Sequence, residues 1–157
     1  MIVVADTSPI NYLILIGEID VLPALYEQIV IPDAVLEELT RPVSPAAVRK
    51  WLENPPAWLD IRTPGSTNPE PSIPLDAGEL EAIALAEELD ADLLIVDDWA
   101  ARSEAERLGL RVLGTLGVLR DAAADGLLDL CAAVARLRQT NFRVSATFLE
   151  NLLHGNE

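Results

Sequence analysis

Short apolar runs alternate with amphipathic segments along this chain. The runs are rich in Ile, Val and Leu, which is typical of strands buried inside a sheet. The predicted strands are 2–5, 29–31, 58–61 (at an edge), 92–98 and 110–113. The amphipathic segments carry apolar residues at helical spacing. The predicted helices are 9–16, 19–26, 35–41, 46–53, 76–89, 99–108, 116–124, 127–137 and 145–153.

Because strands and helices alternate, we expect an α/β fold, a three-layer α/β/α sandwich with a central parallel sheet. The length of 157 residues predicts one domain over 1–157, helical from about residue 114. Ser8 is predicted to cap the first helix with Pro9 behind it, and Gly17 to end that helix. The proline-rich segment Thr63–Pro74 is predicted to be a loop.

Composition and charge narrow the possible functions. Half of the residues are hydrophobic but only 4% are aromatic, so aliphatic side chains must fill the core. A net charge of −15 argues against a protein that coats nucleic acid and against an anionic membrane surface as partner. The charge does not exclude an enzyme that acts on nucleic acid, because the acids of such an enzyme can surround metal ions. No apolar stretch has membrane-spanning length and no signal peptide opens the chain, so we expect a cytoplasmic protein without a membrane partner.

The single cysteine and the single histidine argue against several kinds of site. Cys131 can form no internal disulfide and lies in an apolar run, so we expect an inert side chain in the core. His154 stands alone, which argues against a histidine-based triad or a multi-histidine zinc site. Carboxylates are therefore the main candidates for metal ligands.

Acidic residues stand where parallel strands end. Asp6 follows the first predicted strand, and Asp97 and Asp98 end the fourth. Glu38 and Glu79 lie on predicted helices next to these strands. Ligands of open parallel sheets sit beyond the carboxyl ends of the strands, so the fold can bring these acids to one edge. Carboxylates without histidine suit Mg²⁺ or Mn²⁺, which prefer oxygen ligands and promote displacement at phosphodiesters.

Most of these acids also fit a plain structural role. Asp76 and Glu79 have the spacing of a helix capping box. Asp98 can cap the helix that follows it, and Glu37 with Glu38 can form a solvated helix face. The acid after the first strand has no such role, because the serine two positions later is the more natural cap.

Four stretches carry motifs in a fixed order. They are Ile2–Pro9 (IVVADTSP), Ile31–Leu39 (IPDAVLEEL), Leu75–Ala86 (LDAGELEAIALA) and Leu94–Asp98 (LIVDD), the last continuing through Ala101–Arg102. Together they resemble the PIN-domain family of ribonucleases, in particular the VapC-like toxins of toxin–antitoxin pairs. The Gly78–Glu79 pattern, the Asp97–Asp98 pair and Gly114–Gly117 resemble one subgroup of that family, described as predicted nucleic-acid-binding proteins.

The resemblance implies a metal-dependent endoribonuclease that cleaves single-stranded RNA. It places catalytic acids that hold Mg²⁺ or Mn²⁺ at Asp6, Glu38, Glu79 and Asp97, with Asp98 beside them as a further ligand. Which member of the Asp97–Asp98 pair faces the metal stays open. The alternative function is a PIN scaffold that binds RNA or a protein without cutting.

The resemblance also implies auxiliary groups near the substrate. Ser8 and Asn11 are candidates for orienting the acids, and Arg102 for contacting phosphate. Their alternatives are cap and surface roles, and for Arg102 an ion pair with Glu106 one helical turn away.

The implied protein partners are a second copy of the chain and a small antitoxin. The aliphatic helices 46–53 and 77–89 predict an apolar surface patch that would serve as the interface of a homodimer. The alternative is that these side chains pack inside one subunit.

Overall fold

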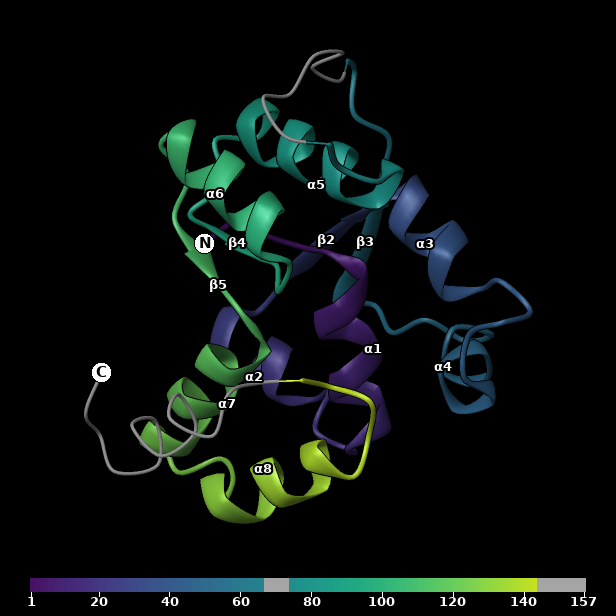
Figure 1. The fold of residues 1–157 in the computed structure, drawn as a ribbon, viewed down its shortest axis with the longest axis vertical. Coiled ribbons are helices and arrows are strands. Elements are labelled where there is room, and N and C mark those ends of the chain that lie inside the picture. Colours follow the sequence, from purple (N-terminus) through teal and green to yellow (C-terminus); the bar gives the residue numbers. More distant parts are fainter. Residues whose placement is uncertain (67–73, 144–157) are drawn as a thin grey trace.

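A parallel sheet forms the centre of the computed structural model, which describes residues 1–66 and 74–143 (Figure 1). The predicted helix 145–153 and His154 lie outside these residues. The strand order is β3-β2-β1-β4-β5, and every neighbouring pair is parallel. The strands are β1 (Val3–Ala5), β2 (Ile29–Pro32), β3 (Leu59–Arg62), β4 (Leu93–Ile95) and β5 (Val112–Leu113). The predicted parallel sheet is confirmed, with β3 at an edge.

Helices connect and cover the strands. They are α1 (Thr7–Leu15), α2 (Val21–Tyr26), α3 (Asp33–Leu39), α4 (Ala46–Trp51), α5 (Ala77–Glu88), α6 (Trp99–Arg107), α7 (Thr115–Ala124) and α8 (Leu130–Arg138). Each matches a predicted helix, although α4 is shorter than 46–53. Gly17 and Gly109 follow helix ends with φ of 76° and 84°, the left-handed conformation that favours glycine.

The start of α1 differs from the prediction. The helix begins at Thr7, and Asp6 occupies the N-cap position, so the predicted Ser8 cap is wrong. The reason lies in the sheet, because the Asp6 N–H still donates to the Ile95 carbonyl at 2.9 Å. The chain therefore turns from strand into helix within one residue.

The helix predicted over the apolar run 127–137 begins later than expected, at Leu130. Asp129 caps α8 by accepting from the Ala132 N–H at 3.1 Å, so the helix starts at Leu130. From that start Ala133, Val134 and Leu137 face the core. Cys131 lies on the other side and is exposed, so the expected core position of this thiol is wrong.

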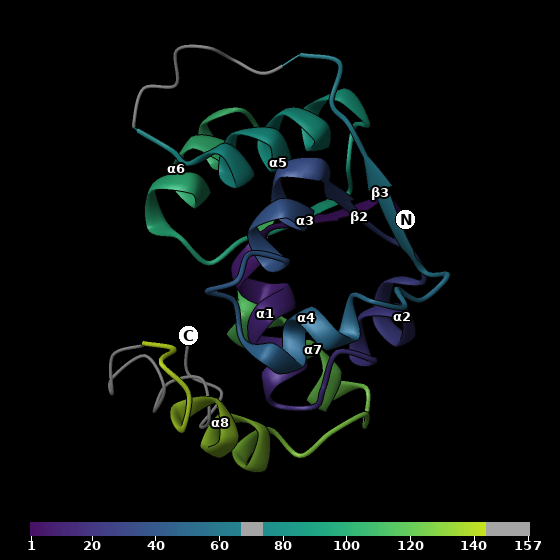
Figure 2. The same ribbon diagram turned by 90° about the vertical axis from the view of Figure 1, so that its right-hand side faces the viewer.

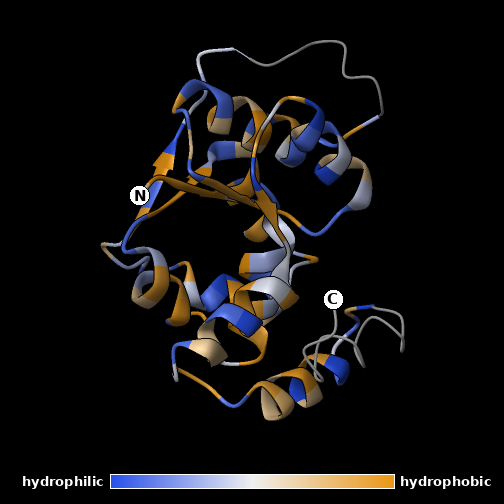
Figure 3. Ribbon diagram, turned by 90° about the vertical axis from the view of Figure 1, so that its left-hand side faces the viewer, coloured by the Kyte–Doolittle hydropathy of each residue, from blue (hydrophilic) through white to orange (hydrophobic). Residues whose placement is uncertain are grey.

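Side chains along the strands alternate between two cores, one on each face of the sheet. One core combines α5 and α6 with Val4, Val30, Leu94 and Val96. The other combines the remaining helices with Val3, Ala5, Ile29, Ile31, Leu93 and Ile95. Figure 2 shows α5 and α6 on one side of the sheet and α1, α2 and α7 on the other, while Figure 3 shows the strongly hydrophobic strands between them. The predicted three-layer sandwich is confirmed.

Most large aliphatic side chains of α4 and α5, where an apolar surface patch is predicted, pack inside the subunit. Val48, Leu52, Leu85 and Ala86 are buried within the subunit. On α5, however, Leu80 and Ala84 are only half-buried and line a pocket with other apolar side chains, so the interface of a homodimer stays a prediction. Within residues 1–66 and 74–143, no helix is long and apolar enough to cross a membrane.

Candidate active site

The acids predicted from the sequence gather around the carboxyl ends of β1 and β4. These strands are neighbours at the middle of the sheet, but the chain runs from β1 to β2 and β3 on one side and returns to β4 on the other. Such a switch in strand order leaves a crevice where open α/β sheets bind ligands. Asp6 directly follows β1, and Asp97 lies two residues past β4. Their proximity follows from the parallel pairing of the two strands.

Asp6 is the most unusual side chain of the site. It is only 4% exposed and makes no capping hydrogen bond to α1, although it occupies the N-cap position. Its Oδ1 is buried and has no hydrogen-bond partner among the described residues. The pKa of Asp6 is raised to about 8, mainly by burial and also by the charges of Glu79, Asp76 and Glu38, while the Thr7 N–H lowers it. A buried carboxyl in this state requires a proton or a cation.

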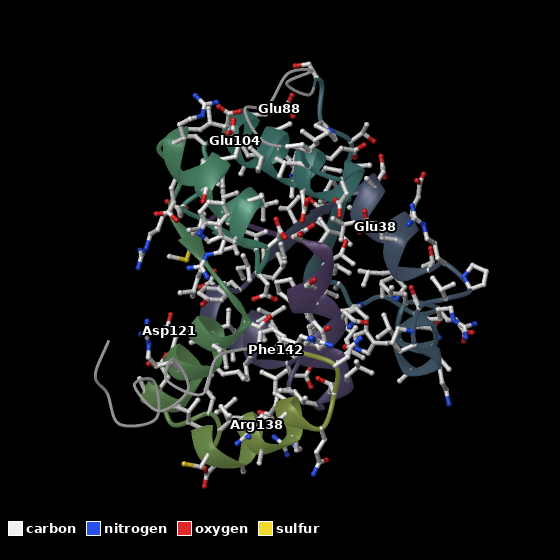
Figure 4. All side chains as sticks on the ribbon, viewed as in Figure 1. Glu38, Glu88, Glu104, Asp121, Arg138 and Phe142 are labelled. Carbon is white, nitrogen blue, oxygen red and sulfur yellow. The ribbon has the colours of Figure 1, made fainter. Side chains whose placement is uncertain are left out.

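Glu38 joins the starts of two helices. Its Oε2 accepts from the Thr7 hydroxyl at 2.6 Å, and its Oε1 accepts from the Gly78 N–H at 3.1 Å (Figure 4 labels Glu38 on α3). A Cβ at position 78 would stand 2.7 Å from that Oε1, so the close approach depends on glycine. Glu38 is half-buried while Glu37 is exposed, so the solvated-face alternative holds for Glu37 and is wrong for Glu38.

Glu79 forms the capping box that its spacing predicts. Asp76 Oδ1 accepts from the Glu79 N–H at 2.8 Å, and Glu79 Oε1 accepts from the Asp76 N–H at 3.0 Å. The pKa of Glu79 is raised to about 7, mainly by burial and also by the charges of Asp76, Asp98 and Glu38, while the Asp76 N–H lowers it. Glu79 therefore caps α5 and also lies in the electric field of the other acids.

The neighbouring acids Asp97 and Asp98 have different environments. Asp98 is exposed and caps α6, accepting from the Ala101 N–H at 3.0 Å, as one of the alternatives predicts. Asp97 turns to the start of α7, where it accepts from the Thr115 N–H at 2.7 Å and the Thr115 hydroxyl at 2.6 Å. Burial raises the pKa of Asp97, and the Thr115 bonds and the Arg102 charge oppose that rise. Of the pair, Asp97 is the one held inside the fold.

Arg102 faces Asp97 across Gly114. Its Nη1 would lie 3.4 Å from a Cβ built on Gly114, and the nearest atom to that Cβ would be Asp97 Oδ1 at 2.9 Å. The ion pairs of the described residues do not include one between Arg102 and Glu106, so that alternative is wrong. The guanidinium is turned toward the acids rather than along its own helix.

The remaining candidates lie along α1. Ser8 and Asn11 are half-buried in its first two turns. Sequence reasoning did not single out the groups that hold the acids, namely Thr7 and Thr115. The available signals were the hydroxyl residue directly after Asp6 and the Gly114–Thr115 step at the start of α7, but spacing alone does not show which acid each one meets.

The carboxylates fit a hard divalent cation by chemistry and charge. The buried Oδ1 of Asp6 and the raised pKa values of Asp6 and Glu79 are the signs of negative groups that lack a compensating charge, whereas Asp97 has the Arg102 charge nearby. Within residues 1–66 and 74–143, however, no three acidic, histidine or cysteine side chains converge as ready metal ligands. The carboxylates of Glu38 and Asp97 instead accept hydrogen bonds from donor groups of the protein. Binding of an ion would exchange some of these hydrogen bonds for metal contacts.

Comparison with known proteins decides the family. The profile of the family DUF3368, described as a PIN domain, matches residues 2–156. The chain belongs to the PIN-domain family. A solved PilT N-terminus domain protein from the hyperthermophilic archaeon Sulfolobus solfataricus P2 shares the fold, with a TM-score of 0.53 and 18% identity over 92% of this chain and 100% of that chain. No curated protein matches the chain significantly. PIN domains are generally nucleases and commonly use divalent metals.

The buried Asp6 predicts how stability depends on pH in the metal-free PIN domain. Its folded pKa of about 8 lies above the ordinary 3.8, so the folded state keeps a proton that the unfolded chain releases. Stability is therefore lost as pH rises from about 4 to about 8. We expect Asp6→Asn to be more stable than the parent by roughly 2 kcal/mol at pH 8, but not at pH 4.

Urea unfolding in EDTA at both pH values measures this difference. Asp20→Asn is the matched control, because Asp20 is exposed and caps nothing with its side chain. A gap between Asp6→Asn and the parent that is the same at both pH values would contradict the raised pKa.

Thr115 predicts a second stability effect. This residue is fully buried and supplies two hydrogen bonds to Asp97. Thr115→Val keeps the shape but removes the hydroxyl donor, so we expect a loss of about 1–3 kcal/mol, while Thr115→Ser should lose clearly less. Urea unfolding at pH 7 checks the order of the variants, and equal stability of the parent and Thr115→Val would show that this bond contributes nothing.

Proposed function

We propose that this PIN-domain protein is a divalent-metal-dependent endoribonuclease that cleaves single-stranded RNA. We further propose that it acts as the VapC-like toxin of a toxin–antitoxin pair. The observation that carries the proposal is the buried Asp6 carboxyl without a partner on Oδ1, placed at the switch point of the sheet among other acids. A protein without chemistry at this crevice has no reason to bury an acid in that way.

The proposed ligands of Mg²⁺ or Mn²⁺ are Asp6, Glu38, Glu79 and Asp97, with Asp98 at the rim. When bound, the ion supplies a nucleophile at neutral pH and positive charge for the scissile phosphate. Thr7 orients the Glu38 carboxylate and Thr115 orients the Asp97 carboxylate, each through a hydroxyl bond of 2.6 Å. These supports fix two acids that follow the strands on either side of β1, Glu38 after β2 and Asp97 after β4.

Three further side chains are assigned to the substrate. Arg102 lies beside Asp97 with its guanidinium turned to the acids, where it can bind a phosphate oxygen. Ser8 and Asn11 follow Asp6 along α1 and are assigned to orienting the acids and to contacts with the RNA near the cleaved bond.

The alternative is a PIN scaffold that binds RNA or a protein without cutting. The caps formed by Glu79 and Asp98 favour it, because these roles explain two acids without catalysis. Neither cap explains the burial of Asp6. The two functions differ in their need for metal, since a scaffold has no use for Mn²⁺ in this crevice.

Cleavage of a mixed pool of single-stranded RNA, with Mn²⁺ or with EDTA, tests the proposal. We expect Mn²⁺-dependent cutting, and we expect Asp6→Asn to lose more than about a hundredfold in rate, beyond the loss typical of groups that only support a ligand. Asp20→Asn should cut like the parent. Asp6→Asn that cuts as fast as the parent would refute the site assignment, and a parent that binds RNA but never cuts would favour the scaffold.

We also propose a homodimer and a small antitoxin as partners, as for the toxins that the motifs resemble. Sedimentation at micromolar concentration should show a species of twice the 17.0 kDa chain mass. A single 17.0 kDa species would reject the dimer.

Co-expression with a small upstream gene, where one exists, should yield a stable complex that no longer cuts RNA, and continued cutting by that complex would reject the antitoxin.

A further inference from the structure

The positive charges of this chain are unevenly distributed. All 11 Lys and Arg residues lie in the part that the structure describes. Six of them fall in two segments without any acid, Thr40–Leu52 and Leu130–Arg143, here called the basic segments. All 26 acids and only five cations lie in the rest of the chain. A surface of that composition repels a polyanion, so the basic segments are the parts of the chain best able to accept one.

The first basic segment is attached to the acid site. It continues directly from α3, and the Ser44 hydroxyl donates to the backbone carbonyl of Glu38 at 2.7 Å. Arg49 Nε in turn donates to the Ser44 carbonyl at 3.1 Å, which holds α4 against this turn. Helix α4 also packs on α1, the helix that starts at Asp6.

The second basic segment meets α1 from another side. The Tyr12 hydroxyl donates to Asn141 Oδ1 at 2.7 Å, and the Tyr12 ring meets Phe142 edge-on at 5.0 Å between centroids. Figure 4 shows Phe142 against α1 and Arg138 on α8. Burial raises the pKa of Tyr12, and the charge of Asp97 raises it further, so this contact lies within the field of the acid site.

Four of the six cations are available to a ligand. Arg41, Lys50, Arg138 and Arg143 are exposed. Arg49 is used within its own segment, and Arg136 pairs with Glu18 at 3.4 Å between Nη2 and Oε1. Each basic segment therefore offers two exposed cations on a framework that is fixed to α1.

We propose that the basic segments are two phosphate-binding arms that hold the single-stranded RNA backbone on either side of the acid site. This rests on the proposed function and adds to it the residues that overcome the net charge of −15. Arg41 and Lys50 bind backbone phosphates on the α3–α4 side, and Arg138 and Arg143 bind them on the α8 side. The scissile phosphate lies between the arms, near Arg102.

The test uses three double variants with the same change in charge. Arg41→Gln with Lys50→Gln removes one arm, and Arg138→Gln with Arg143→Gln removes the other. The matched control, Arg62→Gln with Arg111→Gln, removes two exposed cations outside the basic segments. Thermal melting of all three confirms that the folds are intact.

Binding of a short fluorescein-labelled RNA of mixed sequence is followed by anisotropy in EDTA over a range of salt. We expect each arm variant to weaken binding about tenfold and to flatten the slope of log K against log salt by roughly 1.4, or about 0.7 for each lost phosphate contact on a single strand. The control should stay within about twofold of the parent, since a long-range loss of two charges is screened by salt. With Mn²⁺, the arm variants should raise KM and leave kcat unchanged.

Other outcomes overturn the inference in distinguishable ways. Equal losses in the arm variants and the control would show a general effect of net charge and would refute the arms while leaving the nuclease intact. Arm variants that bind RNA normally but sediment as monomers or lose a co-purified acidic protein would show that the basic segments bind protein. A parent that neither binds nor cuts RNA would overturn both the arms and the proposed function.

Discussion

The burial of the Asp6 carboxyl is the constraint on which the rest of the site depends. The backbone of Asp6 is still part of the sheet, bonded to β4, while its side chain already belongs to the start of α1. This position removes the carboxyl from water without giving Oδ1 a partner. Withdrawing a charge in this way costs free energy that only a proton or a cation can offset. In the metal-free protein this cost raises the pKa of Asp6, so that the carboxyl keeps its proton.

Hydrogen bonds from the surrounding structure hold each of the other acids in its own position around the crevice. Thr7 and Gly78 hold Glu38, the cap of α5 holds Glu79, and Thr115 holds Asp97. These bonds are made at the starts of three helices, α1, α5 and α7, so the positions of these helices determine the spacing of the acids. The same framework also carries the basic segments, since α1 contacts both of them. Acids at the crevice with basic segments packed on the same helix are what the proposed metal-assisted cleavage of a polyanion would need.

The strands and most helices could be predicted because both faces of the sheet are buried, which leaves continuous apolar runs in the sequence; the strand order is seen only in the structure. A shared edge of the sheet for Asp6 and Asp97 could also be predicted from parallel strands, whereas the direct pairing of β1 with β4 is seen only in the structure. The errors concern features that depend on where a helix starts or turns. Ser8 does not cap α1, because the helix begins at Thr7 directly after Asp6. Cys131 is exposed, because α8 begins at Leu130 after its Asp129 cap and turns other side chains toward the core. The partners of Glu38 and Asp97 depend on helix packing between distant segments, which periodicity does not contain.

The most direct test of this account is the titration of the Asp6 carboxyl, followed by carbon-detected NMR with and without Mg²⁺ and assigned with Asp6→Asn. The account predicts a pKa of about 8 in the metal-free protein, well above the ordinary 3.8, and a marked fall when Mg²⁺ is added. An Asp6 that titrates near 3.8 without metal would show that its burial carries no electrostatic cost. A raised pKa that Mg²⁺ leaves unchanged would show that this carboxyl does not bind the ion.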